Sequence, residues 1–172
     1  AVAGDSAGGN LAAVVAAVDP STRPFARLLI YPATDSHTPR PSQRLFAQGF
    51  ALTLRDRDEF FRHYLGGVEV RLDDPRLSPF AGVRLSREVP TVVVVAGFDV
   101  LRDEGNAYAD ALRRDDAPVQ VLRFLSLEHG FIHLTGVCST ARHAISEIAR
   151  AWRDVLCGVR RQPDLIDRVK PS

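Results

Sequence analysis

The sequence contains no methionine, a single lysine and two cysteines among 172 residues. Its 22 basic and 21 acidic side chains nearly cancel and are interleaved along the chain. That balance gives no field of the kind that draws a protein to nucleic acid or to an anionic membrane. No apolar run approaches the roughly 20 residues that span a bilayer, and the first residues lack the basic and then apolar order of a secretory signal. We therefore expect a globular protein without a nucleic-acid partner or a transmembrane segment.

The scarcity of cysteine argues against a disulfide framework. Cys138 and Cys157 fall on one predicted helix, which separates them by about 28 Å, too far for a disulfide. We expect both to be buried, reduced thiols, which fits a cytoplasmic location.

Three short runs predict β-strands, over residues 25–33, 90–98 and 119–126. The first two are almost wholly apolar, as in parallel strands that helices cover on both faces. Helical periodicity fills the intervals, and the last helix is expected to begin with Ser139 as its N-cap and to close at Gly158. This alternation predicts a doubly wound, mostly parallel α/β sheet. The residues that share a helical face are Leu11, Val14, Val15 and Val18; Ala107, Ala111 and Leu112; and Ala141, Ala144, Ile145, Ile148, Ala149, Trp152, Val155 and Leu156.

Residues 35–89 form a long insertion between two strands that we expect to be neighbours. The insertion has a helix-like stretch over 43–65 with an expected break near Gly49, and then an irregular part. So long an excursion usually covers something, so a helical lid or cap is predicted. The residues after 158 are polar and predict a frayed tail over 159–172.

A serine lies between two glycines in Gly4-Asp5-Ser6-Ala7-Gly8. A G-x-S-x-G pattern is typical of a sharp turn from strand to helix, where the two backbones approach too closely for a Cβ atom. The turn exposes the serine hydroxyl at a helix N-terminus. The pattern alone also fits a glycine-rich helix entry, and Asp5 within it is either a polar brace or merely exposed.

A serine hydroxyl becomes a nucleophile only beside a base that a carboxylate orients. Asp99 and His129 each follow a predicted strand, so both are expected at the same edge of the sheet as Ser6. Asp103 and Glu104 remain alternatives for the acid, although they also suit the N-terminal end of a helix through its dipole.

Other histidines are weaker candidates for the base. His133 is close enough along the chain to compete, whereas His37 lies in a loop and His63 and His143 on helical stretches. Glu128, beside the preferred histidine, is expected to face solvent.

The stretches "GDSAGGNLA", "SPFAGVRLSREVPTVVVVAGFDVLRDEGNAYADAL" and "HGF", in this order, resemble the hormone-sensitive-lipase-type branch of the α/β-hydrolases, a group of carboxylesterases and lipases. The resemblance covers residues 1 to about 155. It implies a catalytic triad of Ser6, Asp99 and His129, and an oxyanion donor at the N–H of Ala7. The family usually has proline after the acid, where this chain has Val100.

The resemblance also implies a function. We expect hydrolysis of short- to medium-chain carboxylic esters, small-molecule substrates, without a cofactor or a metal. Residues 1–158 would be a partial catalytic domain with its cap at 35–89. The acyl pocket or the core would take the apolar side chains of the insertion, Phe46, Phe50, Leu54, Phe60 and Phe61.

One family feature is absent from these residues. Further oxyanion donors in the family come from an upstream H-G-G-G loop, and losing one such donor costs about 10² to 10³ in rate. Only "AVA" remains of the strand that enters the serine turn, so we expect the 25–33 strand to expose an unpaired apolar edge. Both observations predict that the chain is the C-terminal portion of a longer hydrolase.

Other functions stay open from sequence alone. The chain could be an inactive fragment, a ligand-binding relative without catalysis, or an enzyme of related chemistry such as amide hydrolysis. The sequence indicates no oligomeric state.

Overall fold

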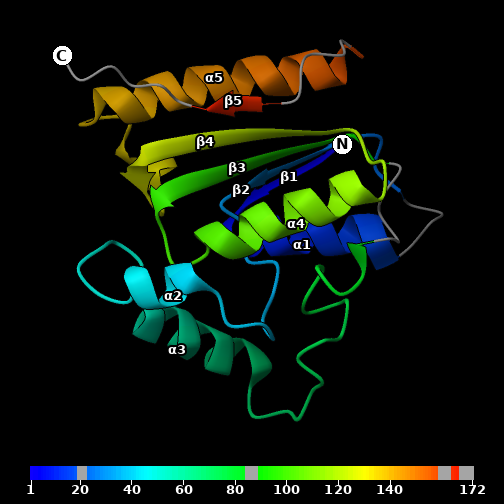
Figure 1. Cartoon of the computed structure of the whole chain (residues 1–172), viewed down its shortest axis with the longest axis vertical. Helices are drawn as coiled ribbons and strands as arrows, with labels where there is room; N and C mark the ends of the chain where they lie inside the picture. Colours follow the sequence, from blue (N-terminus) through cyan, green and yellow to red (C-terminus); the bar gives the residue numbers. More distant parts are fainter. Residues whose placement is uncertain (19–22, 84–88, 159–163, 167–172) are drawn as a thin grey trace.

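A parallel five-stranded sheet in the order β1-β2-β3-β4-β5 forms the centre of the protein in the computed structural model (Figure 1). The structure describes residues 1–18, 23–83, 89–158 and 164–166. The predicted parallel α/β sheet is thereby confirmed. The strands are β1 (Val2–Asp5), β2 (Arg27–Ile30), β3 (Thr91–Phe98), β4 (Val119–Glu128) and β5 (Asp164–Ile166).

The two ends of the sheet differ from expectation. β1 pairs in parallel with β2 over all four of its residues, and β3 pairs with the other side of β2. The prediction that the 25–33 strand exposes an unpaired edge is therefore wrong, because the four residues of β1 pair with that edge of β2. At the far end, β5 pairs with β4 inside the region predicted to be a frayed tail. The rest of that tail lies outside the described residues.

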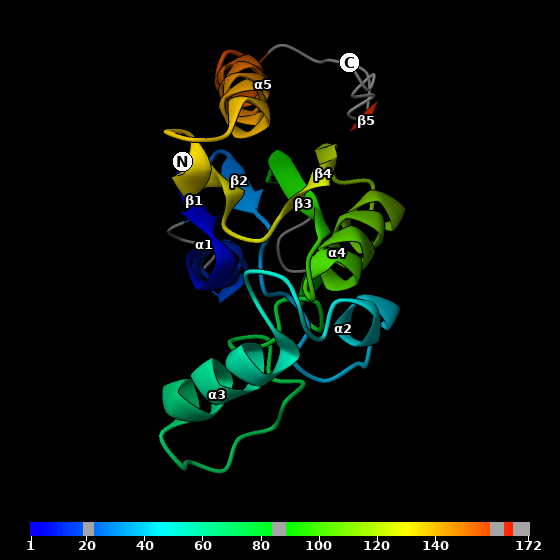
Figure 2. The ribbon, with the colours of Figure 1, turned by 90° about the vertical axis from the view of Figure 1, so that its left-hand side faces the viewer.

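Helices cover both faces of the sheet (Figure 2). Helices α1 (Ser6–Val18) and α4 (Arg102–Arg114) lie on one face, and α5 (Ser139–Leu156) lies on the other. Successive side chains of a strand point to opposite faces. Val92 and Val94 of β3 accordingly belong to the core under α5, whereas Val93 and Val95 belong to the core under α1 and α4. Burial on both faces explains why this strand is continuously apolar.

Small residues bring α1 close to the sheet. Its buried alanines include Ala12, Ala13 and Ala17, whereas Leu11 and Val15, on the predicted apolar face, are 53% and 46% exposed. A helix that packs through alanine leaves little room for larger side chains beneath it. Its larger apolar residues therefore point away from the sheet, and the side chain of Val18 lies outside the described residues.

The last helix starts as predicted, but its cap differs by one residue. Cys138 is the N-cap of α5, and its Sγ accepts a hydrogen bond from the N–H of Ala141. The helix ends at Leu156, with Gly158 just beyond at a φ of 69°. Both cysteines are free, but Cys138 is only partly buried and Cys157 is exposed, so the prediction of buried thiols is wrong.

The helical part of the insertion lies beyond the carboxyl ends of the strands, where β3 and β4 point (Figures 1 and 2). It contains α2 (Pro41–Leu45) and α3 (Leu54–Leu65), with the expected break spread over residues 46–53. Thr53 caps α3 at its start, and Gly66, at a φ of 58°, ends it. Residues 84–88 of the insertion lie outside the described residues.

Candidate active site

The turn from β1 to α1 holds Ser6 in a strained backbone conformation, with a φ of 52°. A Cβ atom on Gly4 would lie 2.1 Å from the carbonyl oxygen of Gly8, so only glycine fits there. A Cβ on Gly8 would meet nothing closer than 4.0 Å, so the steric need predicted for Gly8 is wrong. The second close approach is at Gly9, where a Cβ would lie 2.9 Å from Cβ of Pro32.

The three side chains predicted from sequence meet at the carboxyl edge of the sheet. Nε2 of His129 lies 2.9 Å from Oγ of Ser6, and its Nδ1 lies 2.7 Å from Oδ2 of Asp99. Asp99 is fully buried, and its Oδ1 accepts a hydrogen bond from the N–H of Leu101 at 2.8 Å. The carboxylate is therefore fixed through both oxygens, and the imidazole lies between carboxylate and hydroxyl.

The alternative acids face the insertion instead. Oδ2 of Asp103 accepts a hydrogen bond from the N–H of Ser42, and Oε1 of Glu104 accepts one from the N–H of Thr34. Both carboxyl groups lie on the first turn of α4, as the dipole argument allowed, and each binds backbone of the 35–89 segment or its entrance.

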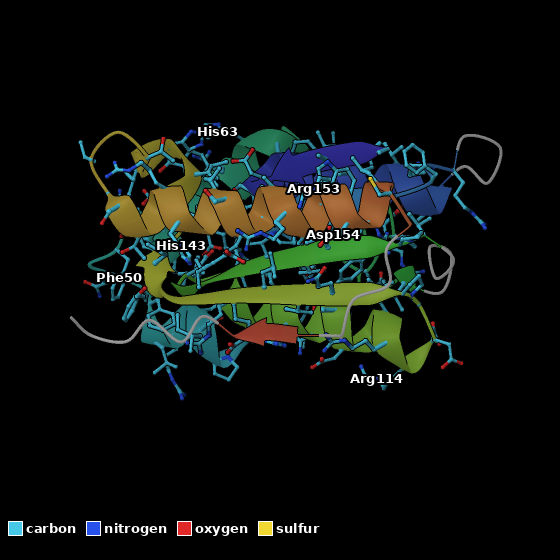
Figure 3. All side chains as sticks on the ribbon, turned by 90° about the horizontal axis from the view of Figure 1, so that it is seen from above. Phe50, His63, Arg114, His143, Arg153 and Asp154 are labelled. Carbon is cyan, nitrogen blue, oxygen red and sulfur yellow. The ribbon has the colours of Figure 1, made fainter. Side chains whose placement is uncertain are left out.

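The other histidines lie away from this arrangement. His133 is 73% exposed, with its Nε2 3.6 Å from Oδ2 of Asp5. His63 and His143 are exposed on α3 and α5 (Figure 3). Asp5 faces both His133 and Oη of Tyr31, at 3.5 Å, which favours the brace over the merely exposed alternative.

Tyr31 is a site residue that the sequence reasoning missed. The centre of its ring lies 4.5 Å from that of His129, and it also meets Phe131 edge-on, with 5.4 Å between ring centres. Burial, reinforced by the charge of Asp5, raises the pKa of the Tyr31 hydroxyl, so the phenol stays neutral. Tyr31 falls within an apolar run that predicts a strand, where an aromatic side chain is ordinarily part of the core. No local sequence pattern therefore distinguishes it as a site residue.

A cavity of about 630 Å³ opens beside Ser6 and His129. Its size suits a small molecule. The insertion contributes Phe60 and Phe61 as predicted, and also Tyr64. The remaining predicted pocket residues, Phe46, Phe50 and Leu54, do not line this cavity.

Glu104 is the buried acidic group in the wall of this cavity. It is 1% exposed, and its Oε2 has no hydrogen-bond partner among the described residues. Burial raises the pKa of the Glu104 carboxyl to about 7, against the opposing effect of the backbone N–H groups that it binds. The group therefore changes charge near neutral pH.

Within the described part of the chain, no group of three or more histidine, cysteine, aspartate or glutamate side chains is placed to hold a metal ion. Nor does that part contain a helix with the length and apolar character needed to cross a membrane.

Comparison with known proteins gives consistent matches. Carboxylic ester hydrolase LipN of Mycobacterium tuberculosis is 42% identical over 160 residues, which are 89% of this chain and 43% of LipN. Ethyl acetate hydrolase of Pseudomonas putida is 32% identical over 160 residues, 91% of this chain and 50% of that protein. The solved structure of ester-hydrolase EH1AB1 from the metagenome of Lake Arreo has a TM-score of 0.78 at 37% identity, covering 88% of this chain and 49% of that one.

The chain spans about half the length of the curated relatives it matches. A family model described as the alpha/beta hydrolase fold matches residues 1–133, which include the serine turn, the buried aspartate and the histidine. This chain therefore belongs to the α/β-hydrolase family, as the motifs suggested.

Proposed function

We propose that this protein hydrolyses carboxylic esters of short to medium acyl chains through an acyl-enzyme on Ser6. The observation that carries the proposal is the position of His129, whose two ring nitrogens lie 2.9 Å from the Ser6 hydroxyl and 2.7 Å from the Asp99 carboxylate. An imidazole held in this way can take the serine proton at neutral pH.

Each chemical step uses a group at the site. Oγ of Ser6 attacks the acyl carbon while Nε2 of His129 takes its proton, and the same proton then passes to the leaving alcohol. Water cleaves the acyl-enzyme by the same route in reverse. Asp99 keeps the proton on Nδ1 and stabilises the imidazolium. Side chains and water supply every step, so the proposal requires no cofactor.

The oxyanion that develops on the acyl group needs hydrogen-bond donors other than the imidazole of His129. We assign one to the N–H of Ala7, because Ser6 begins α1 and the free N–H groups of a helix start lie there. The positive end of the α1 dipole adds to this field.

The substrate class follows from the cavity and the relatives. Phe60 and Phe61 give the cavity an apolar wall suited to an acyl chain. The matched relatives include a carboxylic ester hydrolase and an ethyl acetate hydrolase. We further propose that residues 1–158 act as part of the catalytic domain and that 35–89 is its cap.

A second candidate function is that these 172 residues hold an activated serine but do not turn over ester substrates. It is favoured by the sequence, which contains no H-G-G-G element to supply further oxyanion donors. In this case the nucleophile would still be activated, because activation depends on His129 and Asp99 alone.

The test treats the chain with a fluorophosphonate and, separately, with p-nitrophenyl acetate and butyrate. We expect mass spectrometry to place the phosphonyl group on Ser6, with no labelling of a Ser6→Ala variant. Ester turnover at a rate that Ser6→Ala loses supports the hydrolase. Labelling without turnover favours the second candidate. Absence of both, in this chain and in a form extended upstream with an H-G-G-G element, contradicts the proposal.

A further inference from the structure

The proposed acid and base are each preceded by a residue that contacts the insertion. Phe98 precedes Asp99, and Glu128 precedes His129. Phe98 and Glu128 are also register partners, at the end of the ladder between β3 and β4. The acid loop and the base loop therefore leave the sheet side by side, from one pair of neighbouring residues.

Aromatic side chains join the insertion to the acid loop. The ring of Phe50 stacks on that of Phe98, with 5.3 Å between centres and 13° between planes. Phe46 meets both rings edge-on, and the guanidinium of Arg102 lies 4.8 Å from the centre of the Phe46 ring. Figure 3 shows Phe50 at the end of the sheet where β3 and β4 finish. Residues on both sides of Asp99 are thus held by the insertion.

Ser42 of α2 adds a polar attachment to the same loop. Its Oγ donates a hydrogen bond to the carbonyl of Val100 at 2.9 Å, and its N–H donates one to Oδ2 of Asp103 at 2.8 Å. The N–H of Asp103 donates to the Ser42 hydroxyl at 3.2 Å. Ser42 is fully buried, so its bond to the carbonyl of Val100 is shielded from water. The 42–51 segment is therefore anchored firmly to the loop that carries Asp99.

Glu128 provides the corresponding attachment to the base loop. Its Oε2 accepts a hydrogen bond from the N–H of Ala51 at 3.0 Å, in a solvent-exposed contact. Glu128 is partly exposed and does not line the cavity, in line with the sequence prediction that it faces solvent, but its carboxylate also binds the insertion. Ala51 and Leu52 also line the cavity beside His129. One short segment of the insertion thus touches the acid loop, the base loop and the substrate cavity.

We propose that Glu128 is a positioning residue for the reaction: by binding the N–H of Ala51, it joins the His129 loop to the 42–51 segment, which already holds the Asp99 loop. The proposal rests on the proposed function. Acid and base come from separate strands, and a misplacement of even 1 Å between reacting groups is costly in rate. A bridge outside the triad restricts their relative motion without taking part in the chemistry.

The first test compares Glu128→Ala with Glu128→Gln, because glutamine keeps a carbonyl oxygen that can accept the Ala51 N–H. We expect Glu128→Ala to lower kcat about tenfold, or about 1.4 kcal/mol, with KM nearly unchanged, and Glu128→Gln to retain most of the rate. Ala51→Pro removes the donor instead and should match Glu128→Ala. As a control, Glu147→Ala, which breaks a pair with Arg150 on α5, should leave the rate unchanged.

The second readout is independent of ester turnover. The proton on Nδ1 of His129, shared with Asp99, should give a far-downfield NMR resonance. We expect it to be sharp in the wild type and Glu128→Gln, and broadened in Glu128→Ala and Ala51→Pro. Unchanged kcat and resonance in Glu128→Ala, or equal losses in Glu128→Gln, would overturn the positioning role. If the wild type hydrolyses no ester but the resonance responds as expected, Glu128 still holds the imidazole of His129 beside Asp99, and the missing turnover counts only against hydrolysis by these 172 residues.

Discussion

Val93 in the centre of β3 and Val68 in the 35–89 insertion are the same side chain in opposite surroundings. Val93 is fully buried between two helix layers, whereas Val68 is 65% exposed. The contrast extends to whole elements, because α3 buries none of its residues while α4 buries six, including Tyr108 and Leu112. The sheet is held by apolar burial, whereas the 42–51 segment is held by hydrogen bonds and aromatic contacts with the loops after β3 and β4.

This difference assigns different tasks to the two regions. Close-packed parallel strands place Ser6, Asp99 and His129 with little freedom, as a reaction that needs three aligned groups requires. Helix α3 supplies part of the cavity wall but buries none of its residues, so it can open at a lower free-energy cost than the core. We expect changes in the sheet to affect rate and stability, and changes in α3 to affect substrate preference and local opening.

The largest expected effect is on kcat, and it distinguishes Asp99, which follows β3, from Asp103, which binds the insertion. Asp99→Asn should lower kcat by up to about 10⁴, because the imidazole loses its orienting carboxylate and takes the wrong tautomer. Asp103→Asn keeps an oxygen for the N–H of Ser42 and should lose less than about tenfold. Steady-state hydrolysis of p-nitrophenyl butyrate measures both. The reverse order would move the acid assignment to Asp103.

The next effect concerns Glu104, which joins α4 to the entrance of the insertion. Its pKa in the folded protein, about 7, lies above its ordinary value of 4.5, so the folded state binds this proton more tightly than the unfolded state. The free energy of unfolding that this proton contributes is therefore complete at low pH, and it is lost as pH rises through about 7.

Glu104→Gln removes that titration. The free energy of unfolding of the variant minus that of the wild type should therefore rise between pH 5 and pH 8, by up to about 3 kcal/mol. Urea unfolding of both proteins at each pH measures the difference. A difference that is the same at both pH values would show that Glu104 does not titrate in this range.

A smaller effect tests the contrast in burial directly. Val93→Ala removes two buried methyl groups and should lower the free energy of unfolding by about 2 kcal/mol. Val68→Ala makes the same chemical change at an exposed position and should stay within about 0.5 kcal/mol. Equal losses in urea unfolding would mean that Val68 is as deeply buried in the folded protein as Val93.

The smallest effect is confined to α3. The Thr53 hydroxyl accepts a hydrogen bond from the N–H of Asp56 at 3.1 Å, and the Asp56 carboxylate accepts one from the N–H of Thr53 at 3.2 Å. Thr53→Ala should therefore weaken the helix start by about 1 kcal/mol. Amide hydrogen exchange should speed up in α3 but not in β3. Faster exchange in both would contradict a separately opening insertion.

The centre of the sheet was predictable because β2 and β3 are short, apolar and bounded by Pro or Gly, whereas β5 lies in a stretch predicted to be frayed. Residues 90–98 and 119–126 correspond closely to β3 and β4. The insertion was less predictable, because the stretch 43–65 has one helical pattern but two helices separated by a turn. Its side chains are sorted by contacts with distant loops, as when Phe50 stacks on Phe98, and no local pattern encodes such a partner.

The sequence by itself determined the alternation of strands and helices and the candidates Ser6, Asp99 and His129, because strand order and motif position follow from local periodicity and spacing. Only the tertiary structure decided that His129 reaches both other side chains, that Tyr31 packs on its ring, and that Glu128 binds Ala51. These contacts join residues far apart in the chain. Their geometry is set by how helices pack on the sheet, which depends on all the buried side chains together.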